Sequence, residues 1–190
     1  IDVEGDSISV TSADAGTSLA IRALAGQLTL GTGDAGTTTT LTKQGAAGEL
    51  QATTLTSVGD ATIDSSTDAR LGTISGANVA VTAAEEVTGI GAGARADLTA
   101  NGAGNDVTVD AGTLALLDDV SAPDGVTVTA GTIDIDTVSA GGALALTADS
   151  GDIDLASGTA GTTADIDSFA DATVTSLTSG GNLTVTAMLV

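Results

Sequence analysis

Short apolar segments of alternating character recur about every 20 residues along this chain. Self-similarity at a fixed period of this length is typical of a solenoid, in which each repeat is one turn that buries its apolar side only by stacking on its neighbours. One series of segments begins at Ile8, Leu28, Leu50, Leu71, Val87, Val107, Val126, Leu144, Ile166 and Leu183. A second series runs through Leu114, Ile133, Ile153 and Val174, and a third through Val120, Val138 and Leu177.

Within each repeat the alternation predicts short β-strands. In residues 131–158 the isoleucines Ile133 and Ile135 fall on one face of an extended strand, and Asp134 and Asp136 fall on the other. The connections between such segments are a few residues of Gly, Ser, Ala and Asp, which is too short for the crossover helix of a βαβ unit. Parallel pairing must therefore join equivalent strands one turn apart.

The sequence thus predicts an all-β fold, a right-handed parallel β-helix with about 20 residues per turn and nine to ten turns. A strand spacing of about 4.8 Å makes this a rod roughly 45 Å long. The alternative is an antiparallel sandwich, with a strand about every 8 to 12 residues. A sandwich gives no reason for a repeat of about 20 residues, so we favour the β-helix.

Composition is uniform over residues 1–190, so we expect one domain, a β-helix repeat segment of a longer protein. The core must be thin, because its apolar residues are Ala, Val, Leu and Ile, with a single aromatic residue, Phe169. We expect Phe169 to fill a wider turn of the core. The spacing of the first series stretches to 22 residues near residues 157–176, which predicts a small loop or bulge there.

The chain carries a net charge of −21, with 25 acidic and 4 basic side chains and no His or Cys. Residues 96–190 contain 14 acids and no base. A surface with this much negative charge repels phosphate backbones and anionic lipids. We therefore expect no nucleic-acid partner and no direct membrane insertion. Cations are its natural counterparts.

Residues 124–131 (DGVTVTAG), 141–158 (GGALALTADSGDIDLASG) and 180–187 (GGNLTVTA) resemble the repeats of filamentous haemagglutinin-type adhesins. These are large β-helical proteins exported by two-partner secretion. The resemblance implies an extracellular protein of the bacterial cell surface, and a structural stalk or spacer in a surface or biofilm-matrix adhesin that mediates cell adhesion. It also implies partners such as exopolysaccharide, reached through the parent adhesin. The Asn-Pro motif of the family's secretion domain does not occur in this chain, and the repeats assign no site residues.

A direct polysaccharide- or glycan-binding face on the β-helix is the alternative function. An enzyme is not expected, because nucleophilic triads need a base that a chain without His and Cys lacks. Paired carboxylates remain as candidate acids and bases, but an anionic substrate would require basic side chains beside them. Thr29, Thr108, Thr127 and Thr184 would form an outward array at one-turn intervals, which could bind ice or simply reflect strand propensity.

Calcium is the one cofactor that the sequence suggests. Asp134, Asp136, Asp152 and Asp154 would face outward, with Asp134 and Asp154 about 5 Å apart on adjacent turns. Carboxylates this close repel one another, and Ca²⁺ would relieve the repulsion because it accepts several carboxylate oxygens. A solvated acidic face with ordinary counterions is the alternative. Residues 101–109 (NGAGNDVTV) match half of a calcium-binding nonapeptide, but no second copy follows.

Overall fold

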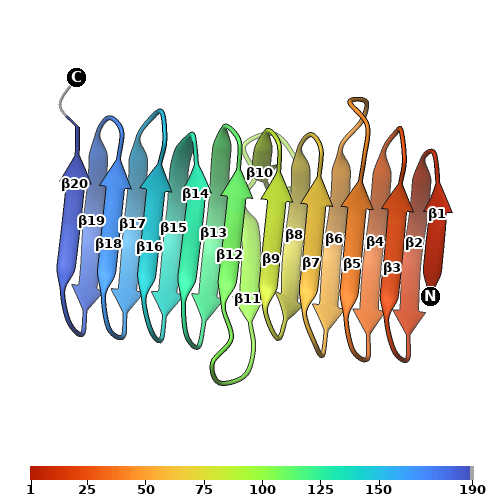
Figure 1. Ribbon diagram of the computed structural model, residues 1–190, viewed down its shortest axis with the longest axis horizontal. Coiled ribbons are helices and arrows are strands. Elements are labelled where there is room, and N and C mark those ends of the chain that lie inside the picture. Colours follow the sequence, from red (N-terminus) through yellow and green to blue (C-terminus); the bar gives the residue numbers. More distant parts are fainter. Residues whose placement is uncertain (189–190) are drawn as a thin grey trace.

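The computed structural model describes residues 1–188 and shows a parallel β-solenoid built entirely from strands and turns, as the repeat predicted (Figure 1). One sheet contains the short strands β1 (Asp2–Gly5), β3 (Leu19–Ala23), β5 (Thr39–Lys43), β7 (Ala61–Ser65), β9 (Val79–Ala83), β12 (Val107–Ala111), β14 (Val126–Ala130), β16 (Leu144–Ala148), β18 (Ala164–Ser168) and β20 (Leu183–Ala187). We call it the flat sheet.

The second sheet, here called the bent sheet, contains eight strands of 8 or 9 residues and two shorter strands that share one turn. They are β2 (Ile8–Ala15), β4 (Leu28–Ala35), β6 (Leu50–Ser57), β8 (Ala69–Gly76), β10 (Glu86–Thr88), β11 (Ala96–Ala100), β13 (Leu114–Ala122), β15 (Thr132–Ala140), β17 (Ile153–Ala160) and β19 (Ala172–Ser179). β10 and β11 share one turn and both pair with β8 and β13. Every pairing in both sheets is parallel, which excludes the antiparallel sandwich.

The coil is right-handed. Strands of the flat sheet rise on the near side of Figure 1, strands of the bent sheet descend behind them, and each turn advances from the N-terminal end toward the C-terminal end. About nine turns of about 20 residues follow from the alternation of one flat and one bent strand per turn. The predicted handedness and repeat length are confirmed. Within residues 1–188 there is no helix long and apolar enough to cross a membrane.

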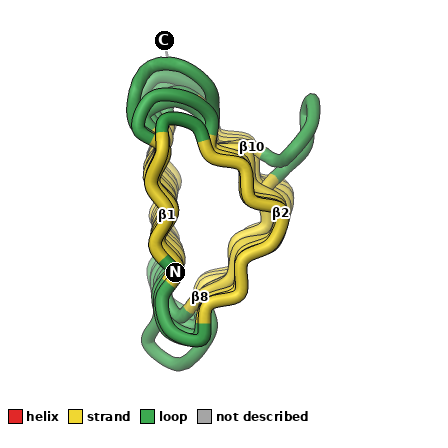
Figure 2. The backbone as a smooth tube through the Cα atoms, turned by 90° about the vertical axis from the view of Figure 1, so that its right-hand side faces the viewer, coloured by secondary structure: helices red, strands yellow, loops and turns green. Residues whose placement is uncertain are grey.

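The strands of 8 or 9 residues in the bent sheet change direction in their middle, which gives the cross-section three sides (Figure 2). The change of direction follows from two consecutive residues that are not buried, such as Asp136 and Thr137 of β15, between the buried residues Ile135 and Val138. Strict alternation is lost for one step there, so the strand turns a corner while keeping apolar side chains inside.

Aliphatic columns along the axis form the core. On the flat sheet, Val109, Val128, Leu146 and Ile166 occupy one column and each is at most 1 % exposed. Stacking aliphatic side chains of similar size one turn apart buries them with few voids, which explains how a chain with a single aromatic residue builds a core.

The register corrects parts of the predicted series. Val107, Val126, Leu144 and Leu183 do share a column, but Ala164 occupies the turn assigned to Ile166. The true step in this column runs from Leu144 to Ala164, which is the regular repeat length. Residues 157–176 keep continuous strand pairing with no bulge. Alanine was overlooked because it carries too little apolar surface to mark a core position in a sequence.

The other series need similar corrections. Ile8, Leu28 and Leu50 share a column of the bent sheet with Ala69 and Val87. Two members of the first series do not continue this column: Leu71 pairs with Ala52, and Val107 lies in the flat sheet. In the second series, Leu114 and Val174 lie outside the column of Ile133 and Ile153, since Leu114 pairs with Thr132 and Val174 pairs with Leu155. The third series is confirmed, since Val120, Val138, Gly158 and Leu177 lie in register.

Three loops interrupt the regular turns: residues 44–49, 89–95 and 101–106. All six glycines with positive φ within the described residues lie in these loops, at Gly45, Gly48, Gly91, Gly93, Gly102 and Gly104. The loop at 89–95 leaves the bent sheet at its corner, between β10 and β11, and projects away from the rod (Figure 2).

Candidate functional site

The structure places the four aspartates of the predicted calcium site in three different environments. Asp134 and Asp154 are direct register partners on β15 and β17, as predicted. Asp136 lies at the corner of β15, and Asp152 lies in the turn before β17, where its carboxylate accepts the Asp171 backbone N–H at 3.1 Å. No group of three or more acidic side chains in residues 1–188 is arranged to hold a metal ion, so calcium binding stays a prediction.

A guanidinium occupies the position beside Asp134. Arg95 Nη1 and Nη2 donate to the two Asp134 carboxylate oxygens, each at 2.9 Å, and Arg95 Nε lies 3.3 Å from an Asp136 oxygen. Nη1 also donates to the backbone carbonyls of Leu117 and Asp134 at 3.2 Å. The guanidinium therefore crosses β13 and joins the end of the 89–95 loop to β15, two turns away. This geometry raises the pKa of Arg95, mainly through its hydrogen bond to Asp134.

More carboxylates surround this contact. β11 and β13 shift register between Ala96 and Leu98, so that Asp118 and Asp119 lie opposite the single residue Asp97. This two-against-one arrangement is a β-bulge, and it directs three acidic side chains to one corner. Loss of hydration raises the pKa of Asp118, and the negative charges of Asp97, Asp119 and Asp136 raise it further, while Arg95 opposes them.

The four cations of the chain are all engaged within the described residues. Arg22 pairs with Glu4 at 3.3 Å, and Arg70 pairs with Glu49 and Asp68. Lys43 is 1 % exposed at the inner corner of β5, where Ala and Ser occupy most neighbouring turns. Its Nζ donates to the Gly45 carbonyl at 2.8 Å and to Thr67 Oγ1 at 3.0 Å, and burial lowers its pKa.

No known protein family, curated protein or solved structure matches this chain. The function must therefore be argued from the geometry above, together with the repeat resemblance.

The predicted threonine array is divided between the two sheets. Thr108 and Thr127 are register partners on the flat sheet and Thr184 lies on the same sheet, but Thr29 lies on β4 of the bent sheet. In the column between Thr127 and Thr184 stand Ala145 and Asp165. The predicted single threonine array is therefore wrong in its N-terminal member and interrupted elsewhere.

The half-nonapeptide at 101–109 forms a loop and the start of β12. The Asp106 carboxylate accepts a hydrogen bond from the Gly125 backbone N–H at 2.6 Å, and the Asp106 backbone N–H donates to Asn78 Oδ1 at 2.9 Å. These side chains therefore cap the backbone of adjacent turns. The contacts give Asn78 and Asp106 a structural role in holding adjacent turns together.

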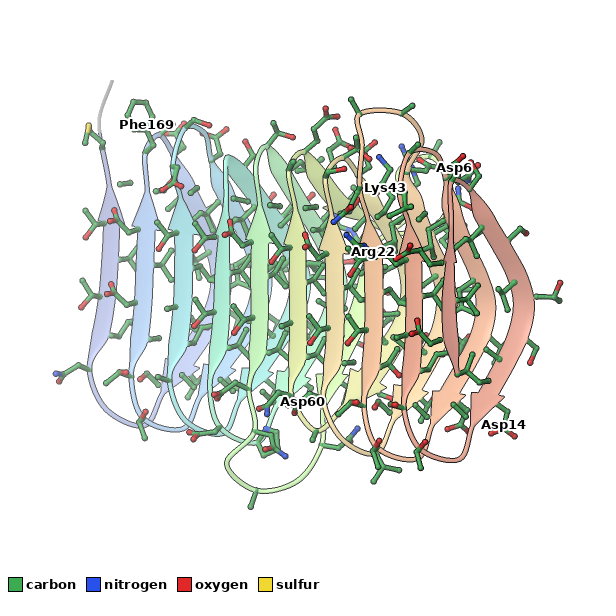
Figure 3. All side chains as sticks on the ribbon, turned by 45° about the vertical axis from the view of Figure 1, so that its right-hand side comes forward. Asp6, Asp14, Arg22, Lys43, Asp60 and Phe169 are labelled. Carbon is green, nitrogen blue, oxygen red and sulfur yellow. The ribbon has the colours of Figure 1, made fainter. Side chains whose placement is uncertain are left out.

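Phe169 was expected inside the core, and this expectation is wrong. It is 45 % exposed at the corner that follows β18 (Figure 3). The inward position of that turn is taken by Ser168, which is buried and hydrogen-bonded to the Gly151 and Asp171 carbonyls. Alternation then places the next residue, Phe169, outside. Around it lies an open hollow of about 170 Å³ lined by Thr147, Ala148, Asp149, Asp167, Ser168, Phe169 and Met188.

Proposed function

We propose that this chain is a structural stalk segment of a secreted bacterial surface or biofilm-matrix adhesin. The observation that carries the proposal is the pair of parallel sheets that continue from β1 to β20 and from β2 to β19. Their hydrogen bonds run along the rod axis, so that bending or stretching the rod must distort many of them together. A stiff spacer needs this property, and an enzyme does not.

Surface charge supports the same role. Within residues 1–188 the cations are engaged with acidic or backbone groups, and most acidic side chains point to solvent. A net charge of −21 keeps rods apart and soluble. The resemblance to filamentous haemagglutinin-type repeats supports an extracellular location and export by two-partner secretion, with adhesion to exopolysaccharide or other surface components supplied by the parent adhesin.

A reach assay tests the stalk role. One, two or three copies of residues 1–190 are inserted between a bacterial surface anchor and a binding domain of known specificity. Capture of ligand-coated beads past a surface polymer layer should increase with copy number, since each copy adds roughly 45 Å. A flexible Gly/Ser linker with the same number of residues is the matched control, and it should reach less reliably because it behaves as a random coil.

Free chain added as a competitor separates this role from the alternative, a glycan-binding face. A spacer does not itself bind the glycans to which the adhesin attaches, so excess free chain leaves capture and cell adhesion unchanged. Retention of the free chain on matrix polysaccharide, or competition with adhesion, would favour the glycan-binding alternative.

A further inference from the structure

The hollow around Phe169 is formed where three adjacent strands of the flat sheet end. Asp149, Phe169 and Met188 directly follow β16, β18 and β20. Backbone hydrogen bonds from Phe169 N–H to the Ala148 carbonyl (2.9 Å) and from Met188 N–H to the Ser168 carbonyl (3.2 Å) keep them in successive turns. The parallel register therefore aligns one carboxylate, one aromatic ring and one thioether along the corner.

A second pair of side chains borders the hollow from the flat face. Thr147 and Asp167 are register partners on β16 and β18, two residues before Asp149 and Phe169. The ring is thus flanked by Asp149 on the preceding turn and by Asp167 on β18, the strand that Phe169 follows. Within residues 1–188, neither carboxylate forms an ion pair or accepts a hydrogen bond from the protein.

The apolar part of the hollow is unusual for this molecule. Phe169 is the only aromatic residue and Met188 the only methionine, and they are 45 % and 58 % exposed. Single exposed apolar side chains are common on protein surfaces, but these two line the same hollow beside two carboxylates. The volume of about 170 Å³ is below the roughly 300 Å³ at which pockets for drug-sized ligands begin, so the hollow suits a small group.

Charge selects among small groups. The hollow contains two carboxylates and no basic side chain, and Arg22, Lys43, Arg70 and Arg95 are all engaged elsewhere. An anion is repelled, and a purely apolar ligand would leave the carboxylates without compensation. An ammonium group with carbon substituents satisfies both components, because its charge is attracted by carboxylates and by the face of an aromatic ring.

We propose that this hollow binds an organic ammonium group, with Phe169 and Met188 contacting its carbon substituents and Asp149 and Asp167 compensating its charge. The site is independent of the stalk role, since a rod can keep its stiffness whether or not the hollow is occupied. Two sources present this chemistry: a choline-type quaternary ammonium headgroup and a lysine side chain of a protein or peptide.

NMR titration of the 190-residue chain tests the proposal. Choline and Nα-acetyl-lysine amide are the two ammonium probes, and 3,3-dimethylbutan-1-ol is the uncharged isostere of choline. The Phe169 ring protons and the Met188 methyl protons are unique signals in this sequence. We expect saturable shifts of both signals with at least one ammonium probe and at least tenfold weaker binding of the isostere. The probe that binds more tightly identifies the source.

Variants locate the interaction. Phe169→Leu keeps an apolar side chain but removes the ring. The affinity measured from the Met188 methyl shift should then fall at least fivefold. Asp149→Asn and Asp167→Asn should each weaken binding. Asp64→Asn is the matched control, because Asp64 is an exposed residue at the same strand position as Asp167 on β7. Since Phe169 is exposed, its replacement should leave the amide spectrum of other turns unchanged.

Several outcomes would overturn the proposal. Equal binding of the isostere would mean a non-selective apolar hollow. Shifts with neutral monosaccharides but not with either ammonium probe would assign the hollow to sugars. Binding that is unchanged in Phe169→Leu, or weakened equally in Asp64→Asn, would mean a diffuse attraction of cations to the acidic surface. None of these outcomes affects the reach assay, so the two proposals fail separately.

Discussion

Arg95 and Asp134 are 39 positions apart and form a two-point contact, with both nitrogen to oxygen distances at 2.9 Å. The contact joins the 89–95 loop to a strand two turns away, and it places the last cation of the sequence beside the Asp134–Asp154 pair. It therefore relieves part of the repulsion for which calcium was suggested. Its role in stability can be measured directly.

Arg95→Gln should lower the free energy of unfolding by about 1–2 kcal/mol, because it removes charge-assisted hydrogen bonds from side chains that are only 25 % and 35 % exposed. Urea denaturation measures this loss, and it should shrink at high salt. Arg22→Gln is the control, since its pair with Glu4 is about half exposed and should contribute less than about 0.5 kcal/mol. In the Asp134→Asn background, Arg95→Gln should lower the free energy of unfolding by clearly less than in the wild type. An equal loss in both backgrounds would show that the Arg95–Asp134 contact contributes nothing to stability.

Asp118→Asn should raise the melting temperature at neutral pH. The folded state raises the pKa of Asp118 above its ordinary value of 3.8, through loss of hydration and the charges of Asp97, Asp119 and Asp136. The ionised form therefore destabilises the fold, and this penalty is relieved as pH falls through the raised pKa toward 3.8. Melting curves between pH 7 and pH 4 should converge for the wild type and the variant. Asp64→Asn, flanked by Thr42 and Thr82, should change little.

Much of the architecture could be predicted because strand alternation and a 20-residue repeat constrain a chain to few solutions. The columns that contain Val, Leu and Ile were recognised, whereas turns in which Ala69, Ala164 or Ala172 takes the core position were misassigned. The adjacency of Asp134 and Asp154 followed from the period alone.

The side-chain environments could not be predicted in the same way. Arg95 reaches Asp134 because a loop inserted at the corner of the bent sheet carries it there, and nothing in the spacing of the two residues indicates this. Phe169 is expected in the core because it is the single large apolar residue, although the alternation of β18 already places Ser168 inside and its neighbour outside. Local alternation was the stronger signal there.

Lys43 should give the stability of the fold a different dependence on pH. Burial lowers its pKa below the ordinary 10.5, so the charged form is penalised in the fold. The penalty is complete below the lowered pKa and disappears as pH rises through it toward 10.5, over which range stability increases. In Lys43→Met this increase should be lost. The partners of Nζ keep other bonds, since Gly45 also accepts from Ser66 and Thr67 also donates to Gly48, so the variant should be at least as stable at pH 7.

Denaturation midpoints of Lys43→Met and wild type at pH 7, 8, 9 and 10 test this. The difference between them should be largest at pH 7 and decrease at alkaline pH. A difference that is constant across the series would mean that the Lys43 amine has the same protonation behaviour in the folded and unfolded states.

Thr39→Val should stabilise the fold by about 1 kcal/mol. Thr39 is 1 % exposed in a core column between Leu19 and Ala61, and its hydroxyl has no hydrogen-bond partner within the described residues. Valine has nearly the same shape and removes the unsatisfied polar atom. Thr40→Val, on the exposed face of the same strand, should stay within about 0.5 kcal/mol of wild type. Destabilisation by Thr39→Val would indicate a bound water or another partner for the hydroxyl.

Gly36→Ala and Gly16→Ala should have opposite effects although the two glycines follow equivalent strand ends on adjacent turns. A Cβ at Gly36 would lie 2.9 Å from the Gly16 carbonyl carbon and closer still to its oxygen, whereas nothing lies within 4 Å of a Cβ at Gly16. Neither residue has positive φ, so the two sites differ only in how closely the preceding turn approaches them. Gly36→Ala should cost about 1–3 kcal/mol by forcing the two turns apart. Gly16→Ala should gain about 0.5 kcal/mol by restricting the unfolded chain. Urea midpoints measure both, and equal effects would mean that adjacent turns are not in backbone contact at this corner.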